Sequence, residues 1–154
     1  MKKLLLLLTL FSLSSYGENE QIGVVSRVID GDTINVVIDG TTHRVRYIGV
    51  NTPERNEGCF SEASEANNLM VMGKTVRLVK DKSETDRYGR LLRYVYAGDT
   101  FVNEELVRQG YAEAVLYKPD SEYYEQFAEI EKRSASIELG CHATGIFKDE
   151  SLIR

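Results

Sequence analysis

Apolar and polar residues alternate with a period of two in three runs that follow residue 20. Each run is rich in valine and isoleucine, and together the runs cover residues 22–30, 33–39 and 42–50. A period of two in residues of this type is typical of half-buried β-strands. Asp39-Gly40 separates the second run from the third, and Asp-Gly between two such runs predicts a hairpin with a two-residue turn.

The predicted turn also fixes which residues of the second and third strands face each other. Ile38 is then opposite Thr41, and counting back places Thr33 opposite Arg46. Asp32, which precedes the second strand, is therefore expected beside Arg46, although a β-bulge would shift the pairing by one residue.

The spacing of the apolar residues becomes helical after the third strand. Ala63, Ala66 and Met70 are spaced as on one face of a helix. Ser61 is the expected N-cap of this helix, and Gly73 is expected to end it.

Further along, the pattern predicts two more strands, a short helix, a last strand and a long helix. These elements are expected over residues 74–81, 91–98, 102–110, 111–117 and 121–139, respectively. The buried face of the long helix is expected at Phe127, Ile130, Ser134 and Ile137. The first five strands, with a helix after the third, and the helices near the end predict an α+β fold around a small barrel. The pattern alone does not choose the topology.

The first 17 residues differ from the rest of the chain. Lys2 and Lys3 precede an apolar run, which small residues follow as far as Gly17. This arrangement predicts a signal peptide over residues 1–17, because a run of about 10 apolar residues is too short to span a bilayer. An N-terminal membrane anchor is the alternative. The predicted mature chain, residues 18–154, would be secreted or periplasmic, with no membrane association after cleavage.

The charge of the chain limits how it can bind nucleic acid. Its 19 basic and 24 acidic residues give a net charge of −5, and loss of Lys2 and Lys3 would make it −7. An acidic protein has no general attraction for nucleic acid. Any binding of phosphate must then come from a local site.

The chain contains two cysteines, Cys59 and Cys141. Because an exported chain meets an oxidising compartment, a disulfide between them is the leading interpretation. A zinc site with His43 and His142 is the alternative, although the spacing fits no usual zinc pattern.

Four polar motifs could carry chemistry. They are Asp30-Gly31-Asp32-Thr33, Arg46, Asn51-Thr52-Pro53-Glu54 and the segment 85–90 with Arg87, Tyr88 and Arg90. Each has a structural explanation by itself: a turn, a solvated strand residue, the start of a loop, and an ion pair between Asp86 and Arg90.

The four motifs together suggest a reaction at phosphorus. Hard cations prefer oxygen ligands, which Asp32, Asn51 and Thr52 can supply. The planar donors of two arginines suit a phosphate, and the carboxylate of Glu54 could accept a proton from water. A metal, an arginine clamp and a carboxylate can stabilise the transition state of phosphodiester hydrolysis.

The same motifs, in this order, resemble the thermonuclease (staphylococcal nuclease) family. The similarity also includes residues 102–110 and 117–119, and it runs from about Val24 to the end of the long helix. The resemblance implies a five-stranded OB-fold barrel with three α-helices. It also implies a Ca²⁺-dependent endonuclease, monomeric, that cuts DNA and RNA, preferably single-stranded, and leaves 3′-phosphates.

The resemblance assigns roles to residues that match the motifs of the family. Arg46 and Arg90 would hold the phosphate, and Glu54 would be the general base. The metal ligands would be Asp32, Asn51 and the backbone carbonyl of Thr52. Arg87, Tyr88 and Tyr117 would line the substrate pocket.

This chain departs from the pattern of the family at Asn51 and at Val115. Asn51 stands where an aspartate is expected, and this change would weaken calcium binding. Val115 stands where a second tyrosine is common, which would reduce stacking on a base. A disulfide between Cys59 and Cys141 would join the loop after Glu54 to the end of the last helix.

Two other functions remain open from the sequence. A non-catalytic OB-fold module that only binds nucleic acid is one, and a structural envelope protein is the other. The presence of Asp32, Arg46, Glu54 and Arg90 favours the enzyme, because a module without chemistry has no need of all four.

Overall fold

A computed structural model describes residue 17 and residues 19–149 of the chain. The predicted signal peptide, residues 1–17, lies outside the described residues except for Gly17, so it stays a prediction.

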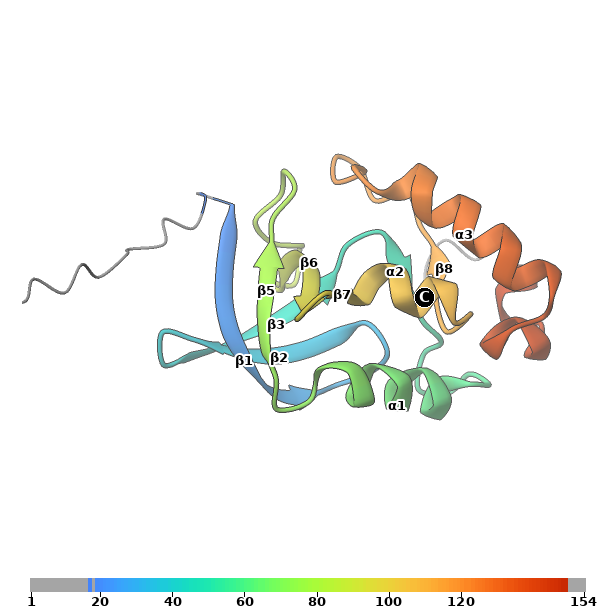
Figure 1. Cartoon of the computed structure of the whole chain (residues 1–154), viewed down its shortest axis with the longest axis horizontal. Helices are drawn as coiled ribbons and strands as arrows, with labels where there is room; N and C mark the ends of the chain where they lie inside the picture. Colours follow the sequence, from blue (N-terminus) through green and yellow to red (C-terminus); the bar gives the residue numbers. More distant parts are fainter. Residues whose placement is uncertain (1–16, 18, 150–154) are drawn as a thin grey trace, which may run out of the picture.

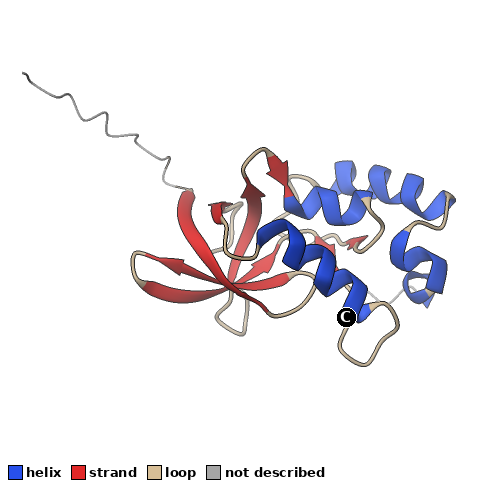
Figure 2. Ribbon diagram, turned by 60° about the horizontal axis from the view of Figure 1, so that its bottom comes forward, coloured by secondary structure: helices blue, strands red, loops and turns tan. Residues whose placement is uncertain are grey.

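Five strands close into a barrel at one side of the molecule (Figures 1 and 2). The neighbours around it are β3, β2, β1, β5 and β6, and a parallel pairing of β3 with β6 closes it. The strands span Glu20–Val28 (β1), Thr33–Ile38 (β2), Thr41–Tyr47 (β3), Thr75–Val79 (β5) and Leu91–Ala97 (β6). Two short antiparallel pairings lie beside the barrel: β7 (Thr100–Phe101) pairs with the end of β6, and β4 (Val50–Asn51) pairs with β8 (Glu113–Ala114).

Three α-helices lie outside the barrel (Figures 1 and 2). They are α1 (Phe60–Val71), α2 (Val102–Arg108) and α3 (Tyr124–Ser136), and two 3₁₀ helices follow at Gly140–Thr144 and Ile146–Asp149. The helix α2 contacts both β6 and α3. A closed barrel of five strands with three helices confirms the predicted α+β class and OB-fold.

The hairpin between β2 and β3 has the predicted register. Thr33 is opposite Arg46, and Ile38 is opposite Thr41. The turn works because Asp39 and Gly40 both adopt positive φ, of 48° and 79°, as a type I′ turn requires. This turn chemistry, together with burial of Ile34, Val36 and Val45 on the inner face, excludes a slip by one residue.

Four details of the predicted elements were wrong. Ser61 lies inside α1, which follows an N-cap at Cys59 with φ of 69° and no side-chain cap. Only Glu113–Ala114 of the predicted strand 111–117 forms a strand, and its partner β4 also has two residues. The long helix begins at Tyr124 and ends at Ser136, so Ile137 lies outside its buried face and is 71% exposed.

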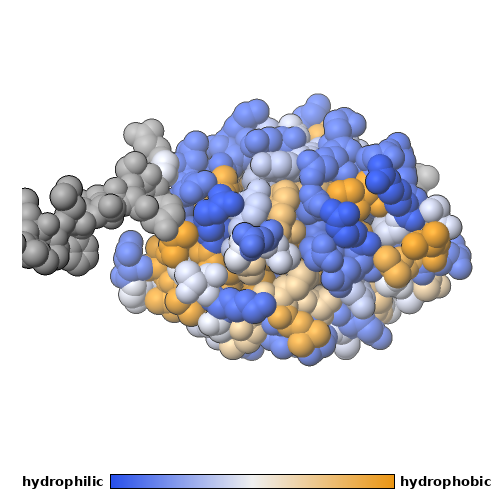
Figure 3. All heavy atoms as spheres, viewed as in Figure 1, coloured by the Kyte–Doolittle hydropathy of each residue, from blue (hydrophilic) through white to orange (hydrophobic). Residues whose placement is uncertain are grey.

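The core is continuous from the barrel to the helices. Strands contribute residues such as Val25, Ile34 and Tyr47, and the helices contribute Leu106 and Phe127. Figure 3 shows one outer face, where hydrophilic side chains predominate and hydrophobic ones form smaller, separate patches. Within the described residues, no helix has the length and apolar character needed to cross a membrane.

Candidate functional site

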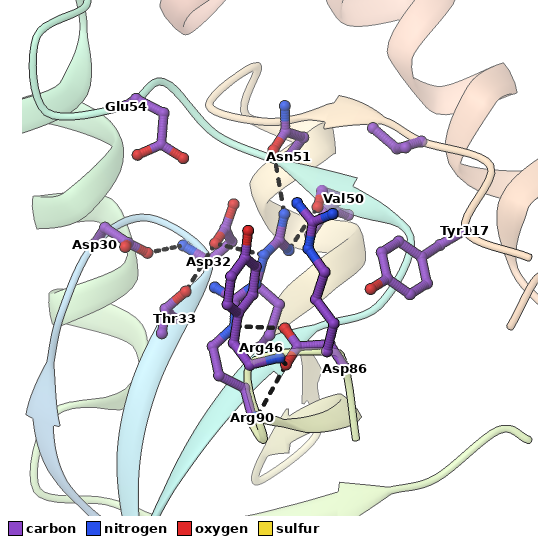
Figure 4. A pocket seen from close by; sticks show the side chains of 13 residues that line it. Asp30, Asp32, Thr33, Arg46, Val50, Asn51, Glu54, Asp86, Arg90 and Tyr117 are labelled. Atoms are coloured by element: carbon purple, nitrogen blue, oxygen red, sulfur yellow. Dashed lines mark hydrogen bonds and ion pairs between the residues drawn. The ribbon is translucent and has the colours of Figure 1, made fainter. Parts of the chain in front are cut away.

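A cleft of about 610 Å³ opens where β2, β3 and β4 meet the turn of residues 86–90 (Figure 4). It contains eight of the nine residues predicted to hold phosphate, metal or substrate, which are Asp32, Arg46, Asn51, Glu54, Arg87, Tyr88, Arg90 and Tyr117. The ninth, Thr52, is buried behind this surface, with 3% of its area exposed. Residues distant in sequence therefore converge on one hollow.

Asp32 and Arg46 lie side by side in the wall of the cleft. Their predicted proximity is confirmed, with 3.1 Å between Arg46 Nε and Asp32 Oδ1. The hydroxyl of Thr33 donates to the same Oδ1, while the backbone N–H and the hydroxyl of Thr52 both donate to Oδ2, each at 3.0 Å. The carboxylate is therefore held from both sides, and its orientation is fixed before any ligand binds.

Arg46 is almost fully engaged within the protein. Besides the bond to Asp32, its Nη1 donates to the carbonyls of Tyr47 and Val50, at 2.6 and 2.8 Å. Its Nη2 donates to Asn51 Oδ1 at 3.1 Å. A guanidinium has five N–H donors, so one remains for a ligand in this geometry.

Arg90 has a different bonding pattern. Its Nε donates to Asp86 Oδ2 at 2.6 Å. Its two terminal nitrogens make no hydrogen bond or ion pair with the part of the chain that the structure describes. They can offer the planar pair of donors that a phosphate accepts. Arg90 therefore has more capacity than Arg46 to bind an anion directly.

Asp86 positions Arg90 through the turn that carries both residues. Its Oδ1 accepts the backbone N–H groups of Tyr88 and Arg90, at 2.9 and 3.0 Å. Burial raises the pKa of Asp86, but the bonds from Arg90 and Tyr88 outweigh burial and hold this pKa below its usual value. The carboxylate is therefore charged at neutral pH. The ion pair that the sequence offered as a structural explanation of Arg90 is present, and Arg90 also lines the cleft.

Glu54 approaches the cleft from the opposite side. Figure 4 shows its carboxylate directed into the hollow, near Asp30 and Asp32. Its backbone N–H donates to Glu57 Oε2 at 2.7 Å, while its exposed side chain makes no hydrogen bond or ion pair with any residue in the described range. A carboxylate in this position is free to receive a proton from a water molecule in the cleft.

Asp30 is a second carboxylate next to Asp32. Its Oδ1 accepts the backbone N–H of Asp32 at 3.1 Å, which makes the turn predicted from the sequence. Asp30 also lines the cleft. Burial, followed by the charge of Asp32, raises the pKa of Asp30 to about 6. A nearby cation would offset both effects.

Asn51 connects Arg46 to a residue that sequence reasoning missed. Its Oδ1 accepts from Arg46, while its Nδ2 donates to Glu113 Oε1 at 3.0 Å. Glu113 lies opposite Asn51 in the β4–β8 pairing. No local signal identifies Glu113, because 62 residues separate it from Asn51 and the contact depends on the fold.

The donor chemistry of the cleft suits a hard cation. Asp30, Asp32, Asn51 and Glu54 present only oxygen ligands, which Ca²⁺ prefers. Among the residues with described positions, no group of three His, Cys, Asp or Glu side chains is arranged to hold a metal. Asp32 and a neighbouring oxygen could hold such a cation, although both oxygens of Asp32 already accept bonds that the cation would have to share.

Arg87, Tyr88 and Tyr117 form the outer part of the cleft. Tyr88 is 68% exposed, and the guanidinium carbons of Arg87 and Arg90 lie 4.8 and 5.5 Å from the centre of its ring. Val115 lines the cleft together with Tyr117. An exposed ring flanked by two cations is a suitable platform for a base and its phosphate.

Cys59 and Cys141 form the predicted disulfide, with 5.6 Å between their Cα atoms. The zinc alternative is excluded, because neither sulfur is free. The bond joins the segment after Glu54 to the first 3₁₀ helix and bridges 82 residues.

Comparison with known proteins agrees with the geometry of the cleft. The family described as staphylococcal nuclease homologue matches residues 44–141. A thermonuclease of Staphylococcus hyicus is 41% identical over 125 residues, which are 77% of this chain and 74% of the relative. A thermonuclease of Staphylococcus intermedius is 36% identical over 84% of this chain and 80% of its own length.

A third relative is longer than this chain. The endonuclease YncB of Bacillus subtilis is 38% identical over 75% of this chain, and the match covers 58% of the relative. The family match covers more than half of the chain and includes most of the residues that line the cleft. The chain therefore belongs to the staphylococcal nuclease family.

Proposed function

We propose that the cleft of this hydrolytic nuclease cuts the phosphodiester backbone of DNA and RNA, preferably in single strands, and leaves 3′-phosphate ends. The observation that carries the proposal is the shared hollow of Arg46, Glu54 and Arg90. A phosphate between these residues would meet donors on one side and a carboxylate on the other. The thermonucleases similar to this chain support this assignment.

The arginines and the carboxylate of Glu54 have different roles in hydrolysis. The free terminal nitrogens of Arg90 bind non-bridging oxygens of the scissile phosphate, and the remaining N–H of Arg46 binds beside them. Both bonds strengthen as negative charge accumulates on these oxygens in the transition state. Glu54 accepts a proton from water as the water oxygen bonds to phosphorus. The bond from phosphorus to the 5′ oxygen breaks, and that oxygen takes a proton from solvent.

Nucleases of this family depend on a metal ion, and we assign Ca²⁺ to this chain. Asp32 would hold it, with Asn51 and the carbonyl of Thr52 as further oxygen ligands. When bound, the cation neutralises charge on the phosphate. In the present geometry Asn51 Oδ1 already accepts from Arg46. As a ligand it would have to share or release that bond, which predicts weak binding of calcium.

The experiment is a digestion assay on single-stranded DNA and on RNA during a titration with Ca²⁺. Cleavage that rises with Ca²⁺, stops with a chelator and yields 3′-phosphate ends supports the proposal. Cleavage with other ends, or cleavage that a chelator does not affect, contradicts it. If oligonucleotides bind but stay intact with every divalent ion tested, the chain is a binding module instead.

The location and the oligomeric state of the enzyme are also proposals. The pattern of residues 1–17 and the disulfide both suit a protein that is secreted or periplasmic. The mature protein would act as a monomer. Size-exclusion chromatography and mass measurement of the exported protein test these two statements.

A further inference from the structure

A row of polar side chains crosses the outer face of the barrel beside the cleft. Arg27 on β1 is opposite Asn35 on β2, and Asn35 is opposite Arg44 on β3. Opposite residues of antiparallel strands have their side chains on the same face of the sheet. The two arginines are therefore on one face, two strands and about 10 Å apart, with an amide between them.

Both arginines are available to a ligand. Their side chains are exposed. Neither makes an ion pair or a hydrogen bond through its guanidinium with any residue that the structure describes. The next residues on this face of β2 and β3 are Thr33, Val37, Thr42 and Arg46, none of which is acidic. In a chain with a net charge of −5, two neighbouring arginines without a carboxylate partner give this face of the barrel a local positive charge.

The row is connected to the cleft. Arg44 lines a hollow of about 410 Å³ together with Tyr88, Gly89 and Arg90. Tyr88 and Arg90 also line the main cleft. Along β3, Arg44 precedes Arg46 by two residues, so the two share a face and lie about 7 Å apart. A chain of phosphates that leaves Arg90 would therefore meet Arg44 and then Arg27.

We propose that Arg27, Asn35 and Arg44 form a subsite for the phosphates of a single-stranded polynucleotide beyond the scissile bond. The inference rests on the proposed nuclease function, because it assigns a position to the rest of the same substrate. A single strand fits better than a small anion, since the cations are spaced along a path and Tyr88 offers a ring on which a base can stack. The subsite gives an acidic protein a local means of holding a polyanion.

The test compares oligothymidylates of about 4 and about 16 nucleotides, the range of site sizes of OB-folds. Binding is measured by fluorescence anisotropy at several salt concentrations, with a chelator present to prevent cleavage. The double variant Arg27→Ala/Arg44→Ala is expected to bind the longer strand about 10-fold more weakly at low salt. Its plot of log Kd against log salt is expected to be shallower by about 1.4, because each phosphate contact on a single strand contributes about 0.7.

Two control variants distinguish the effect of charge at this subsite from the effect of the overall charge of the protein. Arg133→Ala removes an arginine of α3 whose side chain is 75% exposed and which lines no part of the cleft. It is expected to leave both the affinity and the slope unchanged. Arg27→Lys/Arg44→Lys keeps the charges and is expected to keep most of the slope. Circular dichroism confirms that each variant is folded.

The outcomes distinguish this inference from the nuclease proposal. If the alanine double variant and Arg133→Ala give the same slope as the wild type, the subsite is wrong, even where the wild type cleaves DNA. If the slope falls as expected but the wild type cleaves nothing with any metal, the subsite stands and the nuclease proposal fails. A loss that is as large for the short strand as for the long one also overturns the subsite.

Discussion

The wall and the rim of the cleft differ in how far their polar groups are already bonded within the protein. The wall consists of Asp32, Arg46 and Asn51, with Thr52 buried behind them, and the rim consists of Glu54, Arg87, Tyr88 and Arg90. On the wall, Asp32 accepts four bonds and Arg46 donates four of its five N–H groups. On the rim, the carboxylate of Glu54 and the terminal nitrogens of Arg90 have no partner within the described residues.

The difference separates positioning from chemistry. A group that is fully bonded can bind substrate only by giving up a bond, which costs about 1 kcal/mol or more when the group is buried. A free group on the rim incurs no such cost. We infer that the wall fixes the shape and charge of the cleft, while Glu54, Arg90 and the one remaining N–H of Arg46 make the contacts that change during the reaction.

Breaking the disulfide should loosen the rim and leave the wall intact. The segment with Glu54 is tied to the C-terminal part of the fold through Cys59 and Cys141, which are 82 residues apart. Reduction is expected to lower the free energy of unfolding by about 4 kcal/mol, because the unfolded chain regains the entropy of a long open loop. Urea unfolding with and without a thiol reductant measures the change.

The double variant Cys59→Ala/Cys141→Ala is the control for reduction. It should have the lower stability from the start and show no further loss with the reductant. Equal urea midpoints for the oxidised and reduced wild type would contradict this part of the account.

Removal of Arg90 tests the rim directly. Arg90→Ala is expected to lower kcat/KM by roughly 10²–10³, the effect of losing one strong donor to a developing negative charge. Arg90→Lys should recover only part of this loss, because an ammonium cannot replace a planar pair of donors. Digestion rates and thermal melting are measured together. If the loss of activity only matches the loss of folded protein, Arg90 has a structural role, like the residues of the wall, and does not bind the phosphate.

The smallest expected effect concerns a bond behind the wall. Glu113→Ala leaves Nδ2 of Asn51, a residue with 4% exposure, without its acceptor. The free energy of unfolding should fall by about 1 kcal/mol. Glu113→Gln keeps an acceptor oxygen and should lose less. If both variants melt at the temperature of the wild type, Glu113 does not hold Asn51 in place.

Local chemistry made part of this arrangement predictable from the sequence. The Asp39-Gly40 turn fixes the register of β2 and β3, and the register alone places Asp32 beside Arg46. Because an alternating strand has a buried face, a shift by one residue would expose Ile34 and Val45, so the prediction was strongly constrained.

Contacts that depend on several elements were not predictable. The bond from Asn51 to Glu113 needs the short pairing of β4 with β8, which gives no periodic signal in the sequence. The helix start at Phe60 depends on the backbone at Cys59, where φ is positive, and not on a serine cap. The exposure of Ile137 follows from the end of α3 one residue earlier.

The most direct test of the account is the single variant Glu54→Gln. Its side chain has nearly the same shape as that of glutamate but cannot accept a proton from water at neutral pH. With saturating Ca²⁺ and a single-stranded substrate, kcat is expected to fall by about 10²–10⁴, whereas KM and the melting temperature stay close to those of the wild type. A variant with the kcat of the wild type would show that Glu54 is not the base and would contradict the division between wall and rim.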